Sequence, residues 1–166
     1  MMLCFSAKIA VLLKDGEHIK FNFAYDNEEM PDLQKKRNIF DVKSTNQLFE
    51  EICNSFVSFG YDEDEDEDIE VSLDCVYEEY EELYCCDFED DENLDCFKKK
   101  LKSRKLADIE KVFLGVAALH VPEDGVALEW IKYDFVNKTI ESDKERVECF
   151  SRAEYDIDKI INRVFN

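Results

Sequence analysis

Residues 7–25 read AKIAVLLKDGEHIKFNFAY and predict the first hairpin of a β-sheet. The apolar run 7–13 is followed by Asp15-Gly16, a pair that favours a tight hairpin turn. In the second run, polar residues alternate with Ile19, Phe21, Phe23 and Tyr25. Because successive side chains of a strand point to opposite faces, this is the pattern of a half-buried strand. The framework is therefore expected to be a mainly antiparallel sheet.

A second hairpin is predicted between residues 111 and 136. Residues 111–121 (KVFLGVAALHV) are almost continuously apolar, and the turn signal PEDG at 122–125 follows them. Residues 126–136 supply the second strand, with Trp130, Tyr133 and Phe135, and Asn137-Lys138 starts another turn. A short strand is also expected at Asn38–Val42.

Helices are predicted by caps and by apolar residues at helical spacing. Ser44 with Gln47 and Ser151 with Glu154 form two capping boxes, and Gly60 is expected to end the first helix. The apolar face of that helix would be Leu48, Phe49, Ile52, Cys53, Phe56 and Val57. Another helix is indicated by Leu94, Phe97 and Leu101, and the last by Ile157, Ile160, Ile161, Val164 and Phe165.

These elements predict a single α+β domain over residues 1–166, a mainly antiparallel sheet packed with two to four helices. An apolar content of 45% and 13 Phe are ample for its core.

The charge of the chain lies in one third of it. The 54 residues from Ser44 to Phe97 contain 21 Asp or Glu and no Lys, Arg or His, whereas the remaining 112 residues contain 20 acids and 21 bases. Like charges destabilise a compact state by self-repulsion and create a field that attracts cations. A basic partner would compensate this cost.

Two patterns share the middle of this acidic block. Residues 69–77 alternate between apolar and polar, as in a half-buried strand. From Val76 onward, apolar residues recur at helical spacing and leave Glu78, Glu79, Glu81 and Glu82 on the opposite face. The two interpretations overlap at Val76 and Tyr77 and both stay open there. Residues 61–68 are expected to form a mobile acidic loop.

Catalytic and metal-binding signatures are absent from the sequence. The four Gly form no phosphate-binding pattern, His120 lies in an apolar run, and His18 is expected at the surface. An EF-hand starting at Asp62 or at Asp64 would lack its required Gly and Glu. The sequence therefore predicts no enzyme, no cofactor and no metal site.

The seven Cys are odd in number and scattered, and no signal peptide or membrane span is evident. Free thiols that fill the core of a cytoplasmic protein are expected. Bases at 98–105 (KKKLKSRK) are interpreted as counter-ions or a solvated helix face.

The best-supported function is an acidic inhibitor, an immunity protein that occludes the active site of a cognate basic nuclease toxin. No binding to nucleic acid or membrane is expected. Alternatives are a nucleic-acid mimic that inhibits a restriction, CRISPR or other DNA-binding system, a chaperone or scaffold for basic proteins, and an enzyme with an unrecognised site. The predicted partner-binding residues, in which aromatic anchors accompany acids, are Tyr77, Glu78, Glu79, Tyr80, Glu81, Glu82, Tyr84, Asp87, Phe88, Glu89, Asp90 and Asp91.

Overall fold

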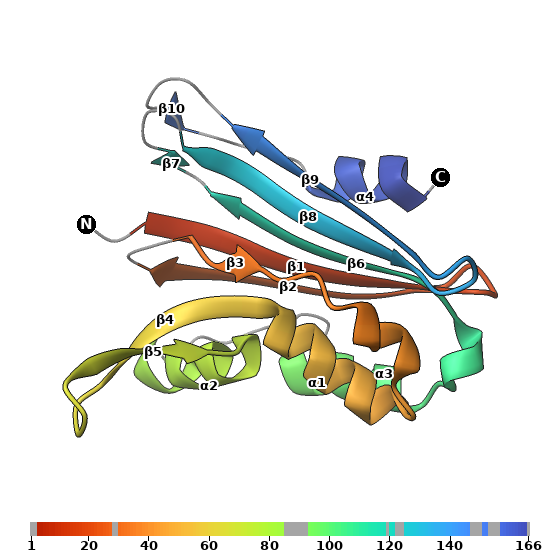
Figure 1. Cartoon of the computed structure of the whole chain (residues 1–166), viewed down its shortest axis with the longest axis horizontal. Helices are drawn as coiled ribbons and strands as arrows, with labels where there is room; N and C mark the ends of the chain where they lie inside the picture. Colours follow the sequence, from red (N-terminus) through yellow and green to blue (C-terminus); the bar gives the residue numbers. More distant parts are fainter. Residues whose placement is uncertain are drawn as a thin grey trace.

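An antiparallel five-stranded sheet forms the framework of the protein (Figure 1). The computed structural model describes residues 3–27, 30–84, 93–118, 120–121, 125–146, 151–152 and 157–165. The sheet has the order β2-β1-β6-β8-β9. Its strands are β1 (Leu3–Leu13), β2 (His18–Asn27), β6 (Ile109–Ala118), β8 (Val126–Asp134) and β9 (Thr139–Arg146).

The first predicted hairpin is confirmed, and so is the strand pairing of the second, whose predicted turn at 122–124 lies outside the described residues. β1 pairs with β2 from Leu3↔Asn27 to Leu12↔His18, and Gly16 in the turn has a φ of 91°, which favours glycine. β6 pairs with β8, and β9 follows after a turn at 135–138 in which Lys138 has a positive φ.

One face of the sheet is covered by three helices, α1 (Thr45–Ser55), α2 (Leu73–Tyr84) and α3 (Leu94–Lys102) (Figure 1). The opposite face carries α4 (Ile157–Phe165). Strand alternation divides the core accordingly. Ile9 and Val11 of β1 belong to the larger cluster, with α1–α3, whereas Ala10 belongs to the cluster under α4.

Smaller elements complete the fold. A three-stranded sheet of order β3-β4-β5 contains β3 (Asp32–Leu33), β4 (Phe56–Asp62) and β5 (Glu67–Val71). β7 (His120–Val121) pairs with β10 (Ser151–Arg152), and two 3-10 helices are η1 (Arg37–Asp41) and η2 (Leu106–Asp108). The predicted fold class, α+β with a mainly antiparallel sheet, is confirmed.

The first predicted helix is shorter than expected. Ser44 caps α1 by accepting a hydrogen bond from the Gln47 N–H, as the sequence predicts. However, the helix ends at Ser55, and Phe56 already has extended backbone angles. Gly60, predicted to end the helix, lies inside β4. Strand pairing with β3 and β5 outweighs the helical periodicity that continues through Phe56 and Val57.

Four other boundary predictions need correction. The strand predicted at 69–77 ends at Val71, and the helical interpretation holds from Leu73 onward. Residues 37–41 form η1 instead of a strand. Ser151 lies in β10 and is therefore not the cap of α4, whose predicted partner Glu154 falls outside the described residues. The segment 61–68 includes the ends of β4 and β5, and its turn is confined to residues 63–66.

Candidate protein-binding surface

The densest acidic stretch forms a β-hairpin that projects from the body of the protein, at the lower left of Figure 1. β4 and β5 pair antiparallel from Ser58↔Val71 to Asp62↔Glu67. The turn between them occupies residues 63–66, where Asp66 has a φ of 52°, a left-handed conformation that Asp tolerates better than most residues. We call residues 62–70 the acidic hairpin.

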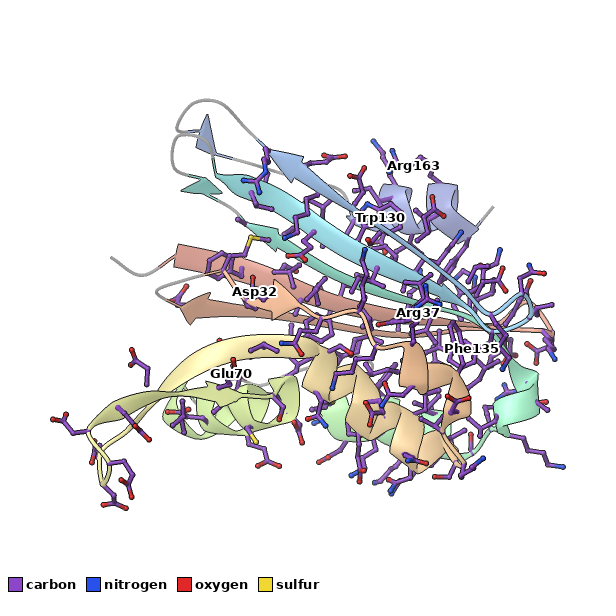
Figure 2. The ribbon with its side chains drawn as sticks, in the orientation of Figure 1. Asp32, Arg37, Glu70, Trp130, Phe135 and Arg163 are labelled. Atoms are coloured by element: carbon purple, nitrogen blue, oxygen red, sulfur yellow. The ribbon has the colours of Figure 1, made fainter. Side chains whose placement is uncertain are left out.

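The acidic hairpin concentrates negative charge at an exposed site. Eight of its nine residues are Asp or Glu. All side chains from Glu63 to Glu70 are exposed, and the carboxylates spread outward around the tip (Figure 2). Charges of one sign on a narrow protrusion produce a local field that accelerates the approach of a cationic partner.

An apolar residue interrupts the acids on β5. Ile69 is 36% exposed and is, with Val136, one of two large hydrophobic side chains exposed among the described residues. The register places Ile69 opposite Gly60, which has no side chain to cover it. Sequence reasoning did not place Ile69 among the partner-binding residues, because the alternation at 69–77 assigned it to a half-buried strand. The pairing of Gly60 and Ile69 depends on strand register, which only the three-dimensional fold defines.

Apart from Tyr77, the predicted partner-binding residues fall into three groups. Glu78 and Glu79 are exposed on α2. Tyr80, Glu81, Glu82 and Tyr84 lie in the last two turns of α2, where the backbone alone is described. The remaining five lie outside the described residues, and these are Asp87, Phe88, Glu89, Asp90 and Asp91.

Tyr77 is a core residue and not a surface anchor. Its side chain is 3% exposed, and its ring packs edge-on against Phe21 at 5.7 Å and Phe23 at 5.1 Å between centroids. These contacts fasten α2 to β2. Tyr77 therefore fixes the position from which Glu78 and Glu79 reach solvent, and its own ring is not available to a partner.

Residues of the basic segment 98–105 interact with groups outside the acidic block as well as within it. Arg104 forms ion pairs with Asp15 and Glu17 of the first hairpin, and Lys98 lies 5.1 Å from the centroid of the Phe49 ring. The counter-ions of Arg104 therefore belong to the hairpin of β1 and β2, outside the acidic block.

A cavity of about 320 Å³ opens between β3 and the edge formed by β8 and β9. Glu129, 8% exposed, lies at its wall with Lys35, Ser142 and Lys144. Burial raises the pKa of the Glu129 carboxyl above its usual value, while Lys144, at 3.6 Å, and the Leu33 N–H act in the opposite direction. The lining therefore contains the buried, partly compensated Glu129 carboxylate, the exposed Asp143, and two lysines.

The nucleophiles and metal ligands that the structure describes are dispersed. No group of three or more His, Cys, Asp or Glu within the described ranges is arranged to hold a metal ion. Cys53 is buried, and burial raises its pKa far above the usual value. Cys75 is exposed, and Cys4 and Cys96 are half-buried, so core filling describes Cys53 better than the other three.

The two histidines lie on different elements. His18, at the start of β2, packs edge-on against Phe165 of α4 at 5.7 Å between ring centroids, and burial lowers its pKa. The His18 ring therefore contributes to the contact between the sheet and α4. His120 lies in β7, where the backbone alone is described.

Within the part of the chain that the structure describes, no helix has the length and apolar character needed to cross a bilayer. The chain matches no protein-family model, no curated protein and no solved structure.

Proposed function

We propose that this protein binds a basic protein and neutralises it, as an immunity protein does for a cognate nuclease toxin. The observation that carries the proposal is the acidic hairpin, an ordered protrusion with eight acids and the exposed Ile69. A nuclease holds its substrate by cationic side chains that contact phosphates. A narrow acidic protrusion is complementary to such a groove in both charge and shape.

Charge and apolar contact have separate roles in this mechanism. The carboxylates of the acidic hairpin, with Glu78 and Glu79 of α2, steer association and select cationic partners. Ile69 adds apolar contact area, since burial of aliphatic surface stabilises a complex where exposed ion pairs contribute little. Occlusion of the groove then prevents nucleic acid from reaching the catalytic residues.

The nucleic-acid mimic remains the second candidate because it relies on the same charge. A mimic needs carboxylates spread along an elongated double row. In the described residues the densest acids instead surround one protruding strand pair with an apolar residue, which favours a dedicated protein partner.

Co-expression with a toxin domain encoded beside this protein tests the proposal. We expect protection of the cells, co-purification of the two proteins, and loss of nuclease activity on tRNA or plasmid DNA with a one-to-one titration endpoint. The inhibition should weaken with salt less steeply than nucleic-acid binding does, because apolar burial contributes besides charge. A failure to bind or protect against any neighbouring toxin would contradict the proposal, as would intrinsic hydrolytic activity that disappears on substitution of His18 or His120.

A further inference from the structure

We infer that the partner is recognised through the outer edge of β5, to which an extended basic segment of the partner adds as the next antiparallel or parallel strand. This inference rests on the proposed function and names the structural element that the partner must supply. Three features carry it: the position of β5 in its sheet, the charge along it, and the alternation of its side chains.

β5 lies at the edge of the three-stranded sheet. The order β3-β4-β5 leaves it paired on one side, with β4. Glu67, Asp68, Ile69 and Glu70 are all exposed. An edge strand presents a row of backbone N–H and C=O groups that can pair with another chain. β5 therefore offers hydrogen-bonding groups for which the described strands provide no second partner.

The charge of β5 determines which strands it accepts. Three of its five residues are acidic. If two copies paired through this edge, acids would meet acids across the new ladder, and like charges directly opposite each other are destabilising. The same side chains favour a strand that bears Lys or Arg. β5 thus resists pairing with itself while it remains open to a cationic strand.

The two faces of β5 predict the pattern of that strand. Because side chains alternate, Asp68 and Glu70 lie on one face, and Ile69 lies on the other with Glu67 and Val71. Because Gly60 has no side chain, Ile69 has no side chain directly opposite it on β4. A strand that alternates basic and apolar residues would place cations beside Asp68 and Glu70 and apolar groups beside Ile69. In strand addition the main chain supplies affinity and the alternate side chains supply specificity.

Three synthetic peptides test this inference on the full-length protein. The first is a short acetylated and amidated peptide in which Lys and Val alternate. The second has the same sequence with N-methyl groups on every second residue, which remove the donors on the pairing edge while keeping the charge. The third has the same composition with the Lys grouped together. Binding is followed by backbone amide NMR shifts and by hydrogen exchange.

We expect the alternating peptide to shift the amides of 67–71 and to slow their exchange. N-methylation should weaken binding by at least about tenfold, because it removes backbone hydrogen bonds across the new ladder. Regrouping should also weaken binding by at least about tenfold, because it removes the alternation that places cations beside Asp68 and Glu70 and apolar groups beside Ile69. Ile69→Thr should weaken binding of the alternating peptide several-fold. Val136→Thr is the matched control, since Val136 is the other exposed large hydrophobic residue and lies in the turn before β9; it should have no effect.

Equal binding of all three peptides would overturn the inference, because it would mean that the acids act as a diffuse charged surface. So would protection confined to residues outside 67–71. Either result leaves the proposed function standing if a basic toxin is still inhibited. A protein that inhibits no toxin contradicts the proposed function whatever the peptides do.

Discussion

Lys8 Nζ lies 2.5 Å from Asp158 Oδ1, so a lysine on β1 holds the first turn of α4 across 150 residues of chain. The other end of the helix is held in the same way, because Lys111 Nζ donates to the Phe165 carbonyl at 3.0 Å and Lys132 Nζ to the Val164 carbonyl at 3.4 Å. Acids at the first turn and cations at the last both favour the helix dipole. A helix of nine residues is marginal alone, so these lysines and its apolar face keep α4 on the sheet.

Asp158→Asn should lower the free energy of unfolding by about 1–3 kcal/mol at neutral pH, because it leaves the largely buried Lys8 ammonium with a weaker partner. The hydrogen bond from Lys8 lowers the pKa of Asp158. The contribution of Asp158 to the free energy of unfolding is therefore present above the usual carboxyl pKa of 3.8, and it is lost as the pH falls through the lower pKa of the folded state. Urea unfolding at several pH values measures this difference.

The double variant Lys8→Met/Asp158→Asn should recover part of the lost stability, since it removes the buried charge together with its partner. Equal stability of the parent and Asp158→Asn at neutral pH would show that the ion pair contributes nothing to the docking of α4.

Charge reversal of the acidic hairpin should slow association with the partner. Glu63→Lys/Glu67→Lys is expected to lower the association rate constant at low salt by at least about tenfold, within the range attributed to electrostatic steering. Stopped-flow or surface-based kinetics measures it. The matched control is Asp41→Lys/Asp143→Lys, which changes the net charge equally at exposed sites outside the acidic block. Equal slowing by both pairs would assign the effect to net charge and not to the hairpin.

Moderate salt should raise the melting temperature of the isolated protein. At about 0.1 M ionic strength the Debye length is about 10 Å, so repulsion between more distant acids of the block is largely screened. A thermal series in NaCl measures the effect. A melting temperature that falls with added salt would mean that attractive pairs, such as those of Arg104, dominate the charge balance.

Glu129→Gln should stabilise the protein at neutral pH relative to the parent and not at acid pH. Burial raises the pKa of Glu129, so the folded state favours the protonated carboxyl. The stabilisation that Glu129 gives the folded state is fully present below its usual pKa of 4.5. It is lost as the pH rises through the raised pKa of the folded state. Gln imitates the protonated form at every pH. Denaturant titrations at acid and at neutral pH measure the stability difference between Glu129→Gln and the parent.

Lys144→Met is the complementary variant, because it removes the cation 3.6 Å from Glu129 and leaves the buried carboxylate less compensated. It should destabilise the protein at neutral pH and have little effect in acid. A parent that is more stable than Glu129→Gln at neutral pH would mean that the Lys144 pair outweighs the cost of burial.

The sequence was sufficient for elements whose signals are local. The Asp15-Gly16 turn predicted the β1–β2 hairpin, and Ser44 with Gln47 predicted the start of α1. The spacing of Leu94, Phe97 and Leu101 predicted the face that α3 buries. In each case the turn, the cap or the periodicity lies within one element, so the chain around it does not alter the result.

Elements that depend on distant pairing were predicted less well. Phe56 and Val57 continue a helical pattern but begin β4, because β3 and β5 supply partners that a local window does not include. The acids of 61–68 have low strand propensity, so they indicated a loop instead of parts of β4 and β5. Tyr77 was assigned to the surface because its neighbours are acidic, although the fold turns it toward Phe21 and Phe23.

The pairing of β1 with β6 also has a consequence for the folding rate. It runs from Phe5↔Ala118 to Leu13↔Ile109 and thereby closes a loop that contains the whole acidic block. The hairpins β1–β2 and β6–β8–β9 can form from neighbouring residues, whereas this ladder must wait for a large loss of chain entropy. We expect closure of that loop to confine the acids to a smaller volume, so that their repulsion slows the pairing of β1 with β6. We therefore expect dissolved salt to accelerate the folding of this protein, and dilute buffer to prolong the time that β1 and β6 spend unpaired.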